Sequence, residues 1–182
     1  MENKLIVISG ASGVGKTTLV NAAVQQIEGL QIVTAVTTRP PRPFEQNSLA
    51  GKKSITNQQF TTLLNQNKLC CVNKVYNAYY AFLKGDIDEA LSGGKVILEY
   101  AVSLLAEIKS IYADCFCIYV YSDNSKMLKD SLKNRNNPQI RYQSDLFDLQ
   151  ALRNKNDMID VFFHNDFTEK SIRRFNEMIC SL

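Results

Sequence analysis

The order of apolar and polar positions predicts a chain in which buried strands alternate with amphipathic helices. Residues 4–9 form a short apolar run, as in strands that are buried on both faces of a parallel sheet. Residues 18–27 then place apolar side chains at helical spacing and stop just before Gly29. A strand followed directly by a helix at the N-terminus is the start expected of an α/β fold.

The same alternation continues along the chain, with one irregular stretch. Strands are predicted at 30–36, 69–76, 96–99, 116–121 and 161–163, and helices at 56–67, 101–110, 124–133 and 169–179. Three prolines within residues 37–45 exclude a helix there. The run Asn134-Arg135-Asn136-Asn137-Pro138 ends the helix before it and opens a loop.

Composition narrows the class of protein. The 182 residues suffice for one α/β domain with a sizeable core, and 45% hydrophobic with 21% charged residues is an ordinary globular balance. A net charge of +3 is too small to indicate a nucleic-acid or membrane partner, and no apolar run reaches the roughly 18 residues of a membrane helix. Five cysteines without a C-x-x-C pair, and no signal-peptide layout, indicate reduced thiols and a cytoplasmic location. Cys115 and Cys117 share one strand face and are expected to be core residues.

The candidate chemistry begins in the loop between the first strand and the first helix. It reads Gly10-Ala11-Ser12-Gly13-Val14-Gly15-Lys16-Thr17 and fits the pattern G-x-x-x-x-G-K-[ST]. Glycines let successive backbone N–H groups point at one anion, and the helix start adds the positive end of its dipole. Lys16 is expected to reach the β- and γ-phosphates, and the Thr17 hydroxyl to take a place on Mg²⁺. The loop therefore predicts binding of a nucleoside triphosphate with Mg²⁺.

A second anion site is suggested by two arginines in the proline-rich stretch. Arg39 and Arg42 lie three residues apart on a stiff, extended segment, and guanidinium groups bind phosphate oxygens in pairs of hydrogen bonds. Taken alone, the stretch fits a solvated, proline-rich loop with incidental arginines better than an anion site.

Together these two motifs resemble the guanylate kinase family. That family typically has G-P-S-G-x-G-K-S-T-L and T-T-R-x-P-R-x-G-E, where this chain has G-A-S-G-V-G-K-T-T-L and T-T-R-P-P-R-P-F-E. Residues 77–81, 94–99, 128–135 and 164–166 are similar to further family segments, so the resemblance covers most of the chain. It implies a three-layer α/β/α P-loop NTPase core with a parallel sheet (residues 1–35 and 86–182), a small inserted domain for the acceptor nucleoside monophosphate (36–85) and a short lid near 135–147.

The resemblance also implies roles for single residues. Lys16, Arg39 and Arg135 would be catalytic, and Thr17 would be the metal ligand. ATP would be bound by Gly10, Ala11, Ser12, Gly13, Val14, Gly15, Lys16, Thr17, Thr18 and Asn165, the last of these near the adenine. The acceptor would be bound by Arg39, Arg42, Glu45, Tyr80 and Glu99. The implied partners are small-molecule nucleotides, with no nucleic acid or membrane, and the chain would be a monomer or a homodimer.

The departures from the family pattern concentrate where the guanine base is read. Residues that would contact the base or its surroundings are replaced by Ala35, Phe44, Cys71, Phe82 and Ala101, and two lid arginine positions appear as Ser131 and Gln143. A thiol at Cys71 cannot replace a carboxylate, because it is a weak acceptor without fixed charge. The residues expected to bind the acceptor phosphate are therefore better preserved than those expected to contact the base.

Three functional hypotheses remain open at this level. The first is an enzyme that moves the γ-phosphoryl group of MgATP to a nucleoside monophosphate, with GMP as the first expectation. The second is a kinase for another phosphorylated small molecule, such as a ribose phosphate. The third is a non-catalytic regulator or scaffold that binds ATP, although a complete donor loop with Lys16 and Thr17 argues against a pure scaffold.

Overall fold

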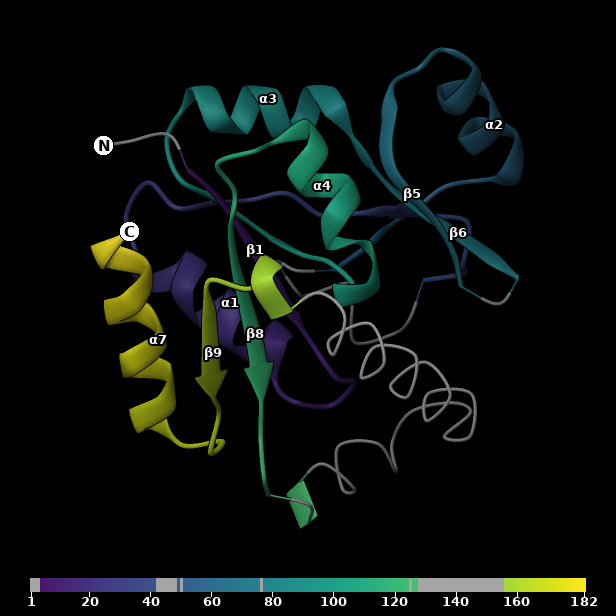
Figure 1. Ribbon diagram of the computed structural model, residues 1–182. Coiled ribbons are helices and arrows are strands. Elements are labelled where there is room, and N and C mark those ends of the chain that lie inside the picture. The colour runs from purple at the N-terminus through teal and green to yellow at the C-terminus, as the bar shows by residue number, and fades with distance from the viewer. Residues whose placement is uncertain (1–3, 42–48, 50, 76, 125, 128–155) are drawn as a thin grey trace.

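A parallel five-stranded sheet forms the centre of the protein (Figure 1). The computed structural model describes residues 4–41, 49, 51–75, 77–124, 126–127 and 156–182. The strand order is β2-β7-β1-β8-β9, and every pairing in this sheet is parallel. The strands are β1 (Leu5–Gly10), β2 (Gln31–Ile32), β7 (Val96–Glu99), β8 (Phe116–Tyr121) and β9 (Val161–His164).

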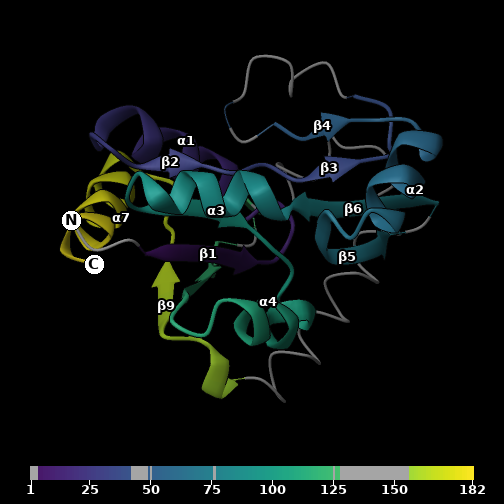
Figure 2. The same cartoon turned by 90° about the horizontal axis from the view of Figure 1, so that it is seen from above.

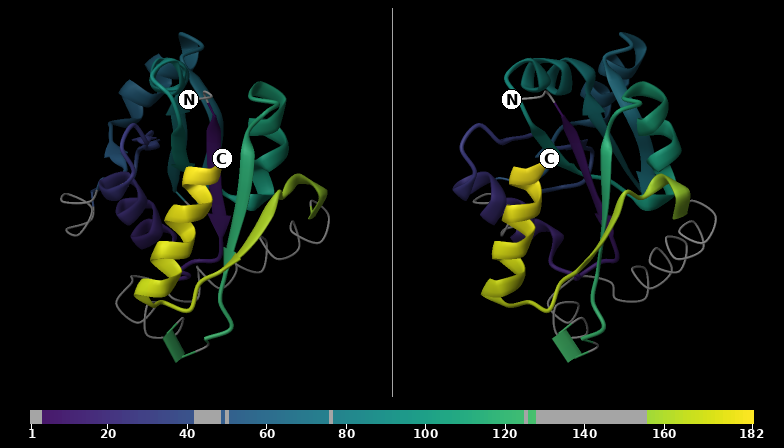
Figure 3. Two further views of the ribbon diagram at one scale, coloured as in Figure 1. Left: turned by 90° about the vertical axis from the view of Figure 1, so that its left-hand side faces the viewer. Right: turned by 60° about the vertical axis from the view of Figure 1, so that its left-hand side comes forward.

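Helices cover both faces of this sheet, as the two rotated views in Figure 3 show. Alternate residues of β1 separate the two layers, since Leu5 and Val7 join one buried cluster while Ile6 and Ile8 join the other. The first cluster packs against α3 (Lys84–Ser92) and α4 (Leu105–Ile111), and the second against α1 (Lys16–Gln26) and α7 (Glu169–Ser181). The three-layer α/β/α architecture expected from the sequence is confirmed.

A second, smaller sheet lies to one side of the core together with α2, as seen from above in Figure 2. Its order is β4-β3-β6-β5, with β3 and β4 parallel and the other pairs antiparallel. The elements are β3 (Val36–Thr37), β4 (Lys53–Ser54), α2 (Asn57–Asn65), β5 (Leu69–Val75) and β6 (Ala78–Leu83). Phe60 of α2 packs with Val36, Leu69 and Ala81 in a separate small cluster.

Most predicted elements agree with the structure within a few residues, and the differences have local causes. The strand predicted at 30–36 is divided into β2 and β3, which pair with different sheets, because the chain crosses from the core to the small sheet there. The helix predicted at 101–110 begins with a 3-10 turn, η2 (Val102–Leu104), before α4. The sequence analysis did not predict α3, β6 or η3 (Asn156–Met158). The helix predicted at 124–133 lies largely outside the described residues.

Candidate functional site

The phosphate loop runs from the C-terminal end of β1 to the first turn of α1. Gly10, Gly13 and Gly15 adopt φ values of 141°, 83° and 89°, a region in which residues with a Cβ are strained. At Gly10 a Cβ would also collide with the backbone carbonyl of Val120 on β8. The loop conformation therefore depends on glycine at these positions, and it opens at the carboxyl ends of parallel strands, where α/β proteins usually bind ligands.

Lys16 lies folded over this loop. Its ammonium group donates hydrogen bonds to the carbonyl oxygens of Gly10 (2.6 Å) and Ala11 (2.9 Å). These contacts hold the positive charge beside the same loop whose N–H groups are expected to face phosphate. Thr17 is half-buried in the first turn of α1, and Thr18 is exposed.

Asn165 braces the loop from the end of β9. Its side-chain amide donates to the carbonyl of Val14 at 2.8 Å and its oxygen accepts from the backbone N–H of Phe167 at 3.0 Å. Asn165 is only 3% exposed, and a Cβ at Gly15 would meet its amide nitrogen. The contact of Asn165 in the structure is thus with the P-loop backbone, a supporting role that the sequence analysis did not anticipate.

Arg39 and Tyr80 meet at the edge of the small sheet. The Nε–H of Arg39 donates to the Tyr80 hydroxyl at 3.2 Å, which leaves the Tyr80 O–H available as a donor to a ligand. Ser54 of β4 fixes the backbone here, because its hydroxyl donates to the Arg39 carbonyl at 2.9 Å. The pair presents a guanidinium and a hydroxyl together, which are the groups expected of a phosphate clamp.

A cavity of about 250 Å³ connects the phosphate loop with the small sheet. It is lined by residues of the loop, of the small sheet and its approach, and of the end of β7: Gly10, Ser12, Lys16; Ala35, Lys52, Cys71, Asn73, Tyr80, Ala81, Phe82; Glu99, Tyr100 and Ala101. Lys16 and Tyr80, predicted for donor and acceptor respectively, thus face one space. Glu99 faces it too, and its Oε1 is buried without a hydrogen-bond partner among the described residues. A buried, unpartnered carboxylate oxygen is suited to accept a hydrogen bond from a ligand.

The inner wall of this cavity is apolar where the family pattern would place base-reading groups. Phe82 is buried and contacts the Tyr100 ring edge-on, with 5.8 Å between ring centroids. Cys71 occupies a bulge of β5 with φ of 56° and is 1% exposed. Its hydrogen bond with Cys70, together with burial, raises the pKa of the Cys71 thiol, so it stays uncharged at neutral pH. Cys71 therefore offers no charged acceptor to a base.

Three polar residues of this cavity were missed by the sequence analysis: Lys52, Asn73 and Tyr100. Lys52 lies in a stretch that does not match the family pattern. Asn73 lies within a predicted strand and Tyr100 directly follows another, and neither residue belongs to a motif. The tertiary arrangement alone brings them to the cavity. Arg42, Glu45 and Arg135, together with Phe44, Ser131, Gln143 and the predicted lid, lie outside the described residues.

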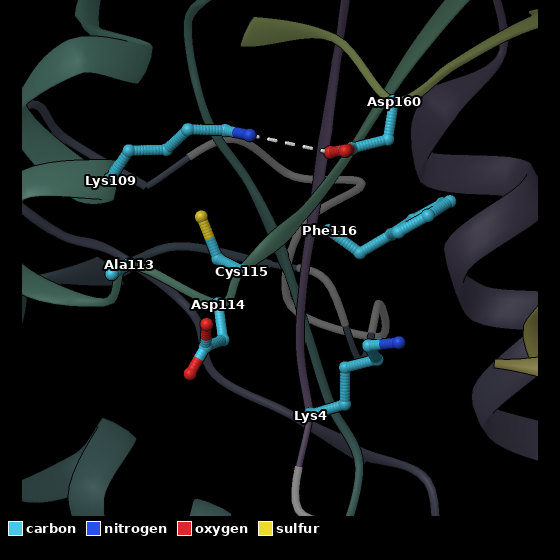
Figure 4. Close-up of a pocket in the computed structure, with 7 residues that line it drawn as sticks. All are labelled: Lys4, Lys109, Ala113, Asp114, Cys115, Phe116 and Asp160. Carbon is cyan, nitrogen blue, oxygen red and sulfur yellow. Dashed lines mark hydrogen bonds and ion pairs between the residues drawn. The ribbon is translucent and has the colours of Figure 1, made fainter.

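A larger cavity, of about 560 Å³, lies at the opposite end of the sheet (Figure 4). Lys109 and Asp160 point toward each other across it, with 3.4 Å between Nζ and Oδ2, and Asp160 also accepts the backbone N–H of Cys117 at 2.7 Å. It lies at the start of β8, where the amino ends of the parallel strands meet, far from the phosphate loop. It is therefore not part of the candidate site.

The described residues contain no cluster of side chains of the kind that binds a metal ion by itself. Among the described residues, no group of three or more His, Cys, Asp or Glu side chains could hold a metal ion. Binding of Mg²⁺ through one hydroxyl, phosphate oxygens and water needs no such group, so the position of Thr17 fits that ion.

No helix in the described segments is long and apolar enough to cross a membrane. All five cysteines are free thiols, and Cys115 and Cys117 are buried, as expected of core residues.

Comparison with known proteins gives one family. The sequence profile described as "Guanylate kinase" matches residues 2–182. Among curated proteins, guanylate kinase of Methylobacillus flagellatus is 31% identical over 136 residues, which is 74% of this chain and 67% of that protein. The enzyme of Koribacter versatilis is 31% identical, with 58% of its length covered. The guanylate kinase of Thermotoga maritima is 25% identical over 190 residues, which is 100% of this chain and 86% of that protein.

A solved structure shares the fold. The crystal structure of guanylate kinase from Anaplasma phagocytophilum superposes with a TM-score of 0.73, covering 98% of this chain and 85% of that one, at 14% sequence identity. At that identity the likeness concerns the fold alone.

Proposed function

The chain belongs to the guanylate kinase family, and from this premise we propose that it transfers the γ-phosphoryl group of ATP to a nucleoside monophosphate, with GMP as the reference acceptor. The observation that carries the proposal is the shared cavity, since Lys16 of the phosphate loop and Tyr80, partner of Arg39, both line it. Such a space lets two phosphate-bearing ligands meet without water between them.

Each group has a part that follows from its chemistry. The loop N–H groups and the helix dipole bind the ATP phosphates, and Lys16 exchanges its contacts with Gly10 and Ala11 for phosphate oxygens. Arg39 and Tyr80 hold the acceptor phosphate in line with the γ-phosphoryl group. Mg²⁺, held through the Thr17 hydroxyl, supplies further neutralisation of phosphate charge when bound. The reaction then proceeds by positioning and charge, without a protein nucleophile.

The same proposal assigns roles to further segments and residues. Residues 36–85 form the acceptor-binding insert, residues 1–35 and 86–182 the core, and the segment near 135–147 a lid that contributes Arg135. Arg42 and Glu45 extend the acceptor clamp, Glu99 accepts from a bound ligand, and Asn165 holds the loop against the nucleotide. The protein works in the cytoplasm on small nucleotides, as a monomer or homodimer, which is consistent with its free thiols.

A turnover assay tests the function. ADP formation from MgATP is measured with GMP, with ribose 5-phosphate and without acceptor, for the wild type, Lys16→Ala and, as a matched control at the remote cavity, Lys109→Ala. We expect GMP-dependent turnover that Lys16→Ala reduces by at least a hundredfold and Lys109→Ala leaves intact. Turnover with ribose 5-phosphate only would favour a sugar-phosphate acceptor. ATP binding without any acceptor-dependent turnover would favour the non-catalytic regulator.

A further inference from the structure

Lys52 is a cation that faces the candidate acceptor cavity. It lines the 250 Å³ cavity and also a small recess beyond it, together with Ala35, Phe82 and Glu99. Within the described part of the chain its ammonium group forms no hydrogen bond or ion pair. The next residue, Lys53, differs in this respect, because its ammonium pairs with Asp86 at 3.2 Å on the outside of the small sheet.

The register of the small sheet places Lys52 at a defined level of the cavity. Val36 pairs with Lys53 on one side and with Ala81 on the other, and Lys53 N donates to the Ala35 carbonyl at 3.0 Å. One residue back along this register, Ala35 lies between Lys52 and Phe82, so their side chains share one face and one level.

The phosphate clamp, which is formed by Arg39 and Tyr80, lies at the next level on the same face. Thr37 pairs with Tyr80, Tyr80 pairs with Asn73, and Tyr80 contacts Arg39. Two residues of strand separate the levels, about 7 Å. With the acceptor phosphate at Arg39, the base of a mononucleotide extends to the level of Lys52.

Among the described residues that line that inner level, Lys52 is the one charged donor. Its neighbours there are the methyl group of Ala35 and the ring of Phe82, while Cys71 and Ala101 line the same wall without a carboxylate. An ammonium group only donates hydrogen bonds, so it pairs with a ring carbonyl oxygen and opposes an exocyclic amino group. Glu99, a charged acceptor, lines the same small recess as Lys52.

We propose that Lys52 reads the base of the acceptor by donating to a ring oxo group, so that the pocket prefers oxo bases to amino bases. The inference rests on the proposed function for the identity of the acceptor site. It deepens that function by naming the acceptor class as oxo-base monophosphates: GMP and IMP among purines, and UMP among pyrimidines.

Ligands that differ by one group test this directly. Dissociation constants are measured by calorimetry for IMP and AMP, for UMP and CMP, and for GMP and ribose 5-phosphate. We expect IMP to bind about ten- to a hundredfold more tightly than AMP, and UMP more tightly than CMP, since one charged hydrogen bond is gained and one donor–donor contact avoided.

Variants at two adjacent lysines assign the effect. Lys52→Met and Lys52→Gln should each remove most of the oxo preference and leave ribose 5-phosphate affinity unchanged, whereas Lys53→Met should preserve the preference. If Lys52→Met weakens every monophosphate and ribose 5-phosphate equally, Lys52 binds phosphate and the proposal is wrong. An unchanged IMP/AMP ratio in Lys52→Met, or no binding of any monophosphate, also overturns it.

Turnover with the same acceptors keeps the two proposals apart. Acceptor-dependent ADP formation without an oxo preference would refute the role of Lys52 and leave the kinase function standing. An oxo preference in binding without turnover would support Lys52 as the reader and remove the catalytic proposal. Cys71→Glu adds a further check, since it introduces a charged acceptor and should make GMP bind more tightly than IMP.

Discussion

Arg39 shows how much of the site depends on single side chains. Its guanidinium is oriented by the Tyr80 hydroxyl at 3.2 Å and by the Pro40 carbonyl at 2.9 Å, and its carbonyl is held by Ser54. A long side chain that is already restrained loses less conformational entropy when it binds an anion. Arg39 is therefore prepared for a phosphate in the free protein.

This arrangement gives the prediction at the residue scale. Arg39→Ala should weaken GMP binding about ten- to a hundredfold, because a charge-assisted contact contributes roughly 1.5–3 kcal/mol. Tyr80→Phe removes a neutral hydrogen bond of about 0.5–1.5 kcal/mol and should cost about two- to tenfold. ATP affinity should change little in either variant. Calorimetric titration of each ligand measures these effects, and equal losses for ATP and GMP would show that Arg39 does not distinguish the two sites.

At the scale of elements, the start of α7 joins the phosphate loop to the edge of the sheet. Asn165 holds Val14 of the loop, and the next residue, Asp166, accepts from the backbone N–H of Thr168 at 3.1 Å and from the hydroxyls of Thr168 and Ser171. Thr168 is the N-cap of α7 and accepts from Ser171 N at 3.4 Å. One short segment thus begins a helix and supports the loop.

The hydrogen bonds to Asp166 predict a pH dependence. Donation from Ser171 and Thr168 lowers the pKa of Asp166 from 3.8 to about 2. A lowered folded-state pKa stabilises the fold at pH values above 3.8, and this contribution is lost as the pH falls toward 2. Asp166→Asn should therefore be less stable than the wild type at about pH 6, and the difference should shrink by about pH 3.

Urea unfolding of both proteins at these two pH values measures the difference. Asp114→Asn, at an exposed aspartate that precedes β8, is the matched control for the exchange of a carboxylate for an amide. A stability difference between wild type and Asp166→Asn that stays constant over this pH range would mean that the carboxylate has the same pKa in the folded and unfolded chain.

At the scale of the whole molecule, ligand binding and stability are linked through the loop. The P-loop lies against β8 at Gly10 and is held by Asn165, which directly follows β9, so a nucleotide held there engages the β8–β9 side of the core sheet. Ligand at a hundredfold excess over its Kd stabilises the folded state by about 2.7 kcal/mol. For a chain of this size that corresponds to a rise in Tm of roughly 5–10 °C.

Thermal unfolding with and without MgATP checks this expectation. The wild type should show the full rise in Tm, and Lys16→Ala should show little of it, because the variant loses the cation that faces the phosphates. Lys109→Ala should behave as the wild type. A rise of equal size in Lys16→Ala would place the nucleotide elsewhere on the protein.

Local patterns were enough to identify the parts of this protein whose structure depends on near neighbours in the chain. The G-x-x-x-x-G-K-T loop, the buried strands at 96–99 and 116–121 and the amphipathic helix at the C-terminus follow from glycine conformations, apolar runs and helical spacing. The motifs were also sufficient for the family, which the match over residues 2–182 confirms.

Long-range pairing decided the rest. The apolar run 30–36 is divided between two sheets because its partners, β7 and β6, come from distant parts of the chain. Asn165 reaches Val14 across 151 positions, and Lys52 reaches the cavity only through its register beside Ala35. Such contacts depend on which strands pair and in which register, and strand pairing is not encoded in the spacing of nearby residues. The phosphate loop could therefore be located from sequence, whereas the residue proposed to read the acceptor base emerged only from the folded chain.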